Sequence, residues 1–230
     1  MKPSKDVPVI TLDGPSGTGK GTICHMLANH LQWHVLDSGS IYRVLALAAQ
    51  KKKIDFNDEK GLAELARSLD LKFETNPEQK AAVLLDGNNV IDEIRSEECG
   101  QNASKIAVLP EVRNALLDRQ RAFAVLPGLV TDGRDMGTVV FPHASLKLYL
   151  YATPEERAFR RYLQLKEKGI DASLAEVVDE LAKRDARDTS RVHAPLKPAE
   201  DAVFIDTTGL TVVQVFEHVL KLLDEHLYFR

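Results

Sequence analysis

We predict a three-layer α/β fold built around a parallel β-sheet. Short apolar runs rich in β-branched residues recur at wide intervals, as buried strands do. Segments with helical periodicity stand between them, and strands that alternate with helices pair in parallel through right-handed crossovers. With 230 residues, 44% of them hydrophobic, the chain can bury one substantial core and is too short for two comfortable independent domains.

The alternation can be read element by element. Five apolar runs are predicted as strands: VPVITL (7–12), WHVL (33–36), GLVT (128–131), SLKLYLY (145–151) and AVFI (202–205). Helices are predicted at residues 22–31, 39–50, 111–125, 154–168, 174–187 and 212–227. The expected result is a five-stranded parallel sheet covered by helices on both faces.

The segment 71–90 does not follow this rhythm. Two strand-like runs, LKFETN and AAVLL, stand there, and the second leads into a strong turn signal, DGNN at 86–89. We therefore expect a small antiparallel insert at about residues 66–105, within a core formed by residues 1–65 and 106–230.

Composition and charge restrict the class of partner. A formal net charge of −4 with 28% charged residues gives no basic character that would draw the chain onto nucleic acid or anionic lipid. No apolar run approaches the roughly 20 residues that span a bilayer. Cys24 and Cys99 are too few for a disulfide framework. We expect a cytoplasmic monomer that binds small molecules, with no nucleic-acid or membrane partner.

The stretch LDGPSGTGKGT, at 12–22, predicts a phosphate-binding loop. It follows a predicted strand and opens a predicted helix, which is the setting that a Gly-x4-Gly-Lys loop requires. Its glycines allow main-chain N–H groups to point inward around a triphosphate, and the helix N-terminus adds positive charge. Lys20 would reach the β- and γ-phosphates, and Thr22 is the candidate hydroxyl for Mg²⁺.

Gly21 stands where signalling GTPases have Ser or Thr directly after the lysine. The order Lys-Gly-Thr is the form seen in nucleoside monophosphate kinases. A GTPase should also carry a base-reading Asn-Lys-x-Asp, and no Asn-Lys pair occurs in the chain. A switch protein is therefore disfavoured, whereas a plain ATPase stays open.

Two positions after the second strand are candidates for binding an anionic acceptor. Ser38 and Arg43 lie at the carboxyl edge of the predicted sheet, where open α/β folds bind ligands. The hydroxyl could donate to the acceptor, and the guanidinium could hold a phosphate bidentately. For Arg43, a surface position on an amphipathic helix is an equal alternative.

Arg134 and Asp135 follow the third strand side by side, and their chemistry matches cytosine. The exocyclic amine of cytosine donates a hydrogen bond, while its ring N3 and O2 accept. Asp135 can take the amine, and a nearby arginine such as Arg113 can meet the ring acceptors. Uracil has the opposite polarity at that edge, and buried polar groups reject such a mismatch strongly. A turn or salt-bridge role for Asp135 is the alternative.

Arginines are repeated between residues 157 and 191, at positions 157, 160, 161, 184, 187 and 191. Spacings of three or four place several on one helical face. Phosphoryl transfer needs such groups, because positioned arginines and Mg²⁺ stabilise the charge on the moving phosphoryl. We assign Arg160 to the donor nucleotide, with a solvated helix face as the alternative, and we expect residues 155–190 to form a helical lid that excludes water.

Together, these segments resemble the bacterial cytidylate kinases of the nucleoside monophosphate kinase group. The resemblance covers nearly the whole chain and depends on ITLDGPSGTGKGT, LDSGSIYR, GRDMGTVVFP and RDARDTSR followed by APL. It implies a P-loop fold with a five-stranded parallel sheet, a small antiparallel insert that binds the nucleoside monophosphate, and a helical lid. It also implies transfer of the γ-phosphoryl group of Mg-ATP to CMP or dCMP.

The resemblance assigns roles by motif position. It implies donor binding by Gly14, Pro15, Ser16, Gly17, Thr18, Gly19, Lys20, Gly21 and Thr22. It implies acceptor binding by Ser38, Arg43, Ser104, Arg113, Arg134, Asp135, Arg184, Asp188 and Arg191, with Asp188 on the ribose hydroxyls. The catalytic groups would be Lys20, Arg134, Arg184 and Arg191. Two rivals stay open: a phosphotransferase for another small acceptor, and a nucleotide-binding regulatory module without turnover.

Overall fold

The structure, a computed structural model, describes residues 7–76 and 79–227. The chain divides into two compact units: unit 1 is Met1–Asp37 with Arg121–Arg230, and unit 2 is Ser38–Gln120. Within the described residues, no helix combines the length and the apolar character needed to cross a membrane.

Unit 1 is built on a five-stranded sheet in which every pairing is parallel, as predicted. Its strands are β1 (Val9–Asp13), β2 (His34–Asp37), β6 (Leu129–Gly133), β7 (Leu146–Tyr151) and β8 (Val203–Asp206). The spatial order is β2-β6-β1-β7-β8. Strands β2 and β6 lie on one side of β1 in this order, and β7 and β8 lie on the other. The carboxyl end of β1 is therefore a topological switch point, where open α/β sheets bind ligands.

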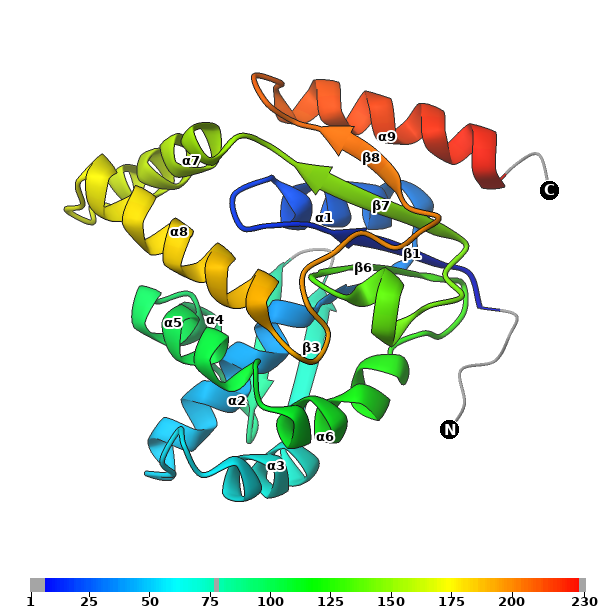
Figure 1. Cartoon of the computed structure of the whole chain (residues 1–230). Coiled ribbons are helices and arrows are strands. Elements are labelled where there is room, and N and C mark those ends of the chain that lie inside the picture. The colour runs from blue at the N-terminus through cyan, green and yellow to red at the C-terminus, as the bar shows by residue number, and fades with distance from the viewer. Residues whose placement is uncertain (1–6, 77–78, 228–230) are drawn as a thin grey trace. The chain divides into compact units, whose positions relative to one another are not determined.

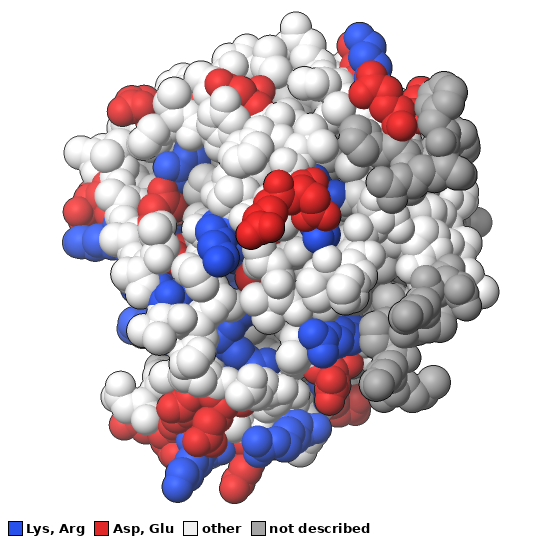
Figure 2. Space-filling model, turned by 45° about the vertical axis from the view of Figure 1, so that its right-hand side comes forward, with Lys and Arg blue, Asp and Glu red and all other residues white. Residues whose placement is uncertain are grey.

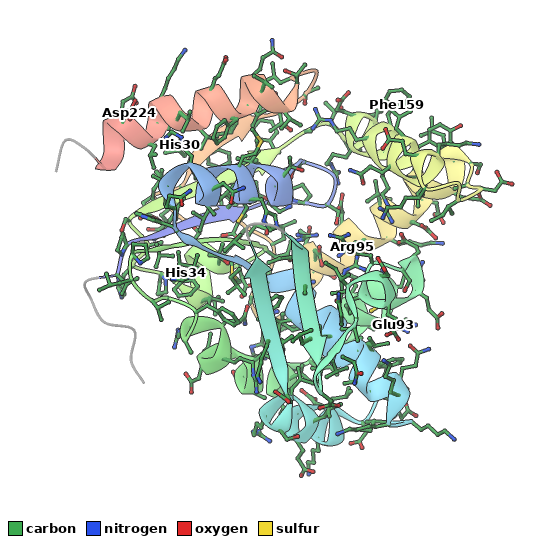
Figure 3. All side chains as sticks on the ribbon, turned by 180° about the vertical axis from the view of Figure 1, so that it is seen from behind. His30, His34, Glu93, Arg95, Phe159 and Asp224 are labelled. Atoms are coloured by element: carbon green, nitrogen blue, oxygen red, sulfur yellow. The ribbon has the colours of Figure 1, made fainter. Side chains whose placement is uncertain are left out.

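The two faces of the sheet are covered differently. Helices α1 (Lys20–Leu31) and α9 (Val212–Leu227) pack on one face, where Ile10 and Leu12 of β1 belong to the core with them. His30 of α1, labelled in Figure 3, lies on the side of this helix that faces α9. Its ring meets that of Phe216 of α9 edge to face, with centroids 6.1 Å apart. A single-turn π-helix, η1 (Met136–Val140), lies against β1 and β6 on the other face, near Thr11.

Two helices form the hairpin predicted as a lid, α7 (Pro154–Glu167) and α8 (Leu174–Ser190), and they lie side by side in Figure 1. They share a small apolar cluster of Ala158, Leu165 and Val177. Each begins at a capping residue: Thr153 accepts from the Glu156 amide, and Ser173 forms a reciprocal capping box with Glu176. The hairpin therefore has its own core and its own helix starts.

Unit 2 contains the predicted antiparallel insert and the helices that pack with it. Its elements are α2 (Ser38–Lys51), α3 (Glu59–Ser68), β3 (Leu71–Asn76), β4 (Gln79–Leu85), β5 (Asn88–Asn89), α4 (Ile91–Ile94), α5 (Glu97–Ile106) and α6 (Pro110–Arg121), whose last residue begins the second segment of unit 1. Strands β3, β4 and β5 form a three-stranded antiparallel sheet. The predicted turn holds Asp86 at φ 49° and Gly87 at φ 77°. Unit 2 extends beyond residues 66–105 because α2 packs on α3, α4 and α5.

Candidate active site

The loop between β1 and α1 has backbone geometry that needs glycine. Gly14 (φ 143°) passes Leu150 so closely that a Cβ would lie 2.0 Å from its carbonyl oxygen. Gly17 (φ 83°) lies against α7, where a Cβ would stand 2.8 Å from that of Arg157. Side chains at these positions would force the loop away from β7 and α7, so the loop shape depends on both glycines.

Lys20 lies folded against this loop. Its Nζ donates to the Pro15 carbonyl at 2.6 Å and to Thr18 Oγ1 at 3.4 Å, and the side chain is 5% exposed. Burial lowers the pKa of Lys20 below its usual value and Arg134 lowers it further, while Asp132 and Asp13 oppose the change. The buried ammonium group of Lys20 is therefore well placed to meet anionic phosphates bound in the loop.

Three carboxylates end the three neighbouring strands β2, β6 and β1. Asp37 and Asp132 are register partners, and Asp132 lies beside Leu12. Burial and the nearby Asp37 raise the pKa of Asp132 above its usual value. Asp13 accepts from the amides of Met136 (2.9 Å) and Gly137 (2.7 Å), and burial raises its pKa to about 6.

Our sequence prediction left these carboxylates out of the site. The signal was present, because an aspartate directly follows each of three predicted strands, in ITLD, VLD and VTD. Parallel strands bring their carboxyl ends to one edge, so three terminal aspartates had to gather there.

Arg134 lies between the phosphate loop and α8. Its Nη2 donates to Ser16 Oγ at 2.7 Å, and its Nε donates to Asp188 Oδ2 at 2.7 Å. Arg191 pairs with the other oxygen, Asp188 Oδ1. Chiefly because of these arginines, the pKa of the Asp188 carboxyl is below its usual value although burial opposes the shift. Four predicted site residues are thus joined by charge-assisted hydrogen bonds.

Asp135 and Arg184 lie in the same unit. Asp135 is 3% exposed and immediately precedes η1, where its carbonyl accepts from Val139 and Val140. Arg184 is partly buried on α8, one helical turn before Asp188. The structure thus places Asp135 at the end of β6 and Arg184 on the hairpin, as the sequence predicts.

The guanidinium of Arg160 is hydrogen-bonded to other groups of unit 1. It donates to Glu156, to Thr207 Oγ1 and to the carbonyls of Thr207 and Leu210. These contacts link α7 to the loop after β8. Whether Arg160 also contacts the donor nucleotide stays a prediction.

Of the other loop residues, Gly21 and Thr22 lie in the first turn of α1, with Thr22 exposed. A Cβ at Gly21 would meet no atom within 4 Å. Gly19 is the N-cap residue of α1, at φ 87°.

The other predicted acceptor residues belong to unit 2. Ser38 Oγ donates to Gln120 Oε1 at 2.7 Å, and Arg43 Nη1 donates to the carbonyls of Ile94 (2.6 Å) and Ser96 (3.1 Å). Arg113 donates to the Ala107 carbonyl at 3.0 Å and stands over the Tyr42 ring.

Ser104 lies on α5, where its buried Oγ has no hydrogen-bond partner among the described residues. An unsatisfied buried hydroxyl is costly, which makes Ser104 a candidate to bind a ligand.

Metal and surface charge give weaker signals. No group of three or more His, Cys, Asp or Glu side chains within 7–76 and 79–227 could hold a metal ion by itself. On the face drawn in Figure 2, basic and acidic side chains are interspersed.

Comparison with known proteins identifies the family. The family model described as cytidylate kinase matches residues 10–225. The chain belongs to the cytidylate kinase family. A cytidylate kinase from Nitrosococcus oceani is 60% identical to it over 94% of the chain and 96% of the relative. Cytidylate kinases from Shewanella denitrificans (95% and 96%) and Pseudomonas syringae pv. tomato (93% and 94%) are 53% and 56% identical.

Membership of the cytidylate kinase family confirms the predicted family and enzyme class, a nucleoside monophosphate kinase. Among solved structures, TT1252 from Thermus thermophilus aligns with a TM-score of 0.47 and 20% identity, over 97% of this chain and 99% of that one. A likeness at this level adds nothing to the fold described above.

Proposed function

We propose that the enzyme transfers the γ-phosphoryl group of Mg-ATP to a phosphate oxygen of CMP or dCMP, giving the diphosphate and ADP. The observation that supports this most is the contact of Arg134 with Ser16 at 2.7 Å. It joins a group predicted for the acceptor to the loop predicted for the donor, within one compact unit. The two ligands would then meet at the carboxyl end of β1.

The residues of unit 1 supply binding and charge stabilisation. The loop amides and Lys20 would hold the β- and γ-phosphates, and Arg134, Arg184 and Arg191 would neutralise the transferred group. The acceptor phosphate is already a nucleophile at neutral pH, so no covalent intermediate is required. Alignment of the two reactants therefore supplies most of the acceleration.

Magnesium fits the residues present at the loop. Thr22 offers a hydroxyl in the first turn of α1, and burial beside Asp37 raises the pKa of Asp132. A buried carboxylate destabilised in this way gains from a nearby cation. Thr22 and Asp132 would hold Mg²⁺, which would supply positive charge to neutralise the phosphates of the donor.

Each unit carries residues that we assign to the acceptor. Asp135 would accept from the cytosine amine and Arg113 would donate to the ring acceptors. Ser38 and Arg43 would hold the acceptor phosphate, Ser104 would donate its hydroxyl to the nucleotide, and Asp188 would accept from the ribose. Since Asp188 now binds Arg134 and Arg191, ribose binding would require these pairs to rearrange. We also propose that the enzyme acts as a cytoplasmic monomer.

A coupled assay across CMP, dCMP, UMP and AMP tests this function. We expect kcat/KM to be highest for CMP or dCMP, because the Asp135 carboxylate can accept from the cytosine amine. Lys20→Met should lower kcat by about 100-fold, in the range of losing one preorganised electrostatic contact. Lys183→Met, on an exposed part of α8, is the matched control and should match the wild type.

Each rival predicts a different result in the same assay. Comparable kcat/KM for AMP and CMP would refute the cytosine assignment and favour another acceptor. ADP release that CMP does not accelerate would favour a binding module without turnover.

A further inference from the structure

Two acidic residues of α8 are each linked through an arginine to the same residue of the phosphate loop. Asp185 and Asp188 stand three positions apart, so they project from one face of the helix. Asp185 Oδ2 pairs with Arg157 Nη2 at 2.7 Å, and Asp188 Oδ2 pairs with Arg134 Nε at 2.7 Å. The function proposed above gives roles to Asp188 and Arg134 but none to Asp185 and Arg157.

Both arginines also donate to Ser16. Arg157 Nη1 donates to the Ser16 carbonyl at 3.1 Å, while Arg134 Nη2 donates to the Ser16 hydroxyl at 2.7 Å. Two parallel connections thus lead from α8 to a single loop residue, one through its main chain and one through its side chain. The main-chain connection is the one able to fix the loop backbone.

The protein holds Arg157 on all three nitrogens of its guanidinium. Nε donates to the Ala152 carbonyl at 3.2 Å, Nη1 to Ser16 and Nη2 to Asp185. The side chain is 6% exposed, and the loop packs directly on it at Gly17. These contacts assign Arg157 to the loop and to α8 rather than to a bound phosphate.

Asp185 likewise takes part in the connection between α8 and Arg157. Its Oδ1 is buried and makes no hydrogen bond among the described residues, whereas its Oδ2 pairs with Arg157. By contrast, the Asp179 and Lys183 pair on the same helix is more than half exposed. The two pairs on α8 therefore differ in burial and in whether they touch the loop.

We propose that Arg157 and Asp185 are positioning residues that set α8 in register with the phosphate loop. The proposal rests on the function above, in which α8 carries Arg184, Asp188 and Arg191 toward the transferred phosphoryl. If the register shifts, these groups no longer meet the charge that develops during transfer. Errors of about 1 Å in such alignment can cost about 100-fold in rate.

A structural role and a positioning role predict different kinetics. A pair that only stabilises the fold lowers the melting temperature, while kcat per folded molecule stays the same. A pair that sets register lowers kcat and leaves the KM for ATP nearly unchanged, because the loop amides that bind the phosphates are retained. The division between kcat and KM is therefore the decisive readout.

The test compares Asp185→Asn, Arg157→Lys and the double variant with Asp179→Asn. Each is assayed with ATP and CMP well below its melting temperature, and rates are divided by the folded fraction from circular dichroism. We expect Asp185→Asn to lower kcat about tenfold or more, with KM for ATP within about twofold, and Asp179→Asn to match the wild type. The kcat of the double variant should be little lower than that of the less active single variant, because all three variants break the same connection between α8 and the loop.

Unchanged kcat per folded molecule in Asp185→Asn, accompanied only by a lower melting temperature, would overturn the proposal. If that variant does not fold, Asp185→Glu replaces it: the charge is kept and the carboxylate moves by one methylene, so kcat should fall and a wild-type kcat would refute the inference. The wild-type enzyme separates the two proposals. If it does not phosphorylate CMP, the proposed function is wrong. If it does and the variants keep the wild-type kcat, only the positioning role is wrong.

Discussion

At the scale of single residues, two buried carboxylates of unit 1, Asp13 and Asp188, are held by main-chain amides and by arginines respectively. Asp13 shows this most simply, because its two carboxylate oxygens receive the amides of Met136 and Gly137 at the start of η1. Those bonds fix the turn that follows Arg134 and Asp135. Asp13, which received no role in the predicted site, therefore holds the position of two residues that did.

Replacing Asp13 by Asn should destabilise the protein. The amide offers one acceptor oxygen to two donors, so one main-chain N–H loses its partner. We expect the free energy of unfolding at pH 7 to fall by about 2 kcal/mol, the usual cost of a buried unsatisfied group. Urea unfolding measures it, and Asp224→Asn, an exposed position on α9 (Figure 3), is the control.

The stabilities of the wild type and of Asp13→Asn should also depend differently on pH. The pKa of Asp13 is about 6 in the folded protein against an ordinary value of 3.8, because burial and Asp135 oppose its charge more than Lys20 and the amides favour it. The folded state therefore binds more protons between these values. Wild-type stability relative to Asp13→Asn should increase as pH falls from about 6 to 4, and a constant difference would contradict the assignment.

At the scale of elements, the strands and most helices could be predicted because their signals are local. Apolar runs that end on aspartate marked β1, β2 and β6, and the Asp86 and Gly87 turn marked the antiparallel sheet. The π-helix η1 could not be predicted, since its start is held by Asp13, more than 120 positions earlier in the chain.

Other differences have similar causes. We did not predict α5, whose sequence EECGQNASKI has few apolar residues and which forms by packing on α2. Helix α6 ends at Arg121, short of the predicted Val125, where Arg121 bonds the carbonyls of Val139 and Val140. In the candidate site, the residues with family roles were visible in sequence. The roles of Asp13, Arg157 and Asp185 depend on contacts between elements that are distant in the chain, so the sequence did not predict them.

The start of α8 offers a test at this scale. Ser173 and Glu176 satisfy two amides reciprocally, at 3.2 and 2.8 Å. Ser173→Ala should weaken the first turn by about 1 kcal/mol, which would appear as faster hydrogen exchange at residues 174–178. Ser190→Ala, at the other end of the helix, is the control because its hydroxyl makes one 3.5 Å bond. Equal exchange in both variants would show that the cap does not hold the helix start.

At the scale of the whole molecule, the candidate residues are divided between the two units. The phosphate loop, Arg134, Asp135 and the α8 residues belong to unit 1, whereas Ser38, Arg43, Ser104 and Arg113 belong to unit 2. All four residues of unit 2 were predicted for the acceptor. We therefore expect CMP to protect helices of unit 2 that the donor nucleotide does not protect.

Hydrogen exchange of the intact protein with each nucleotide examines this division. A non-hydrolysable ATP analogue should slow exchange in residues 14–22 and leave α2, α5 and α6 unchanged, because the amides that would bind its phosphates are in unit 1. CMP should slow exchange in those three helices and in residues 184–191, since binding stabilises the segments that contact the ligand. GMP, which lacks the cytosine amine pattern, serves as the control nucleotide. If CMP protected only unit 1, the acceptor roles of Ser38, Arg43, Ser104 and Arg113 would be wrong, although the donor loop assignment would stand.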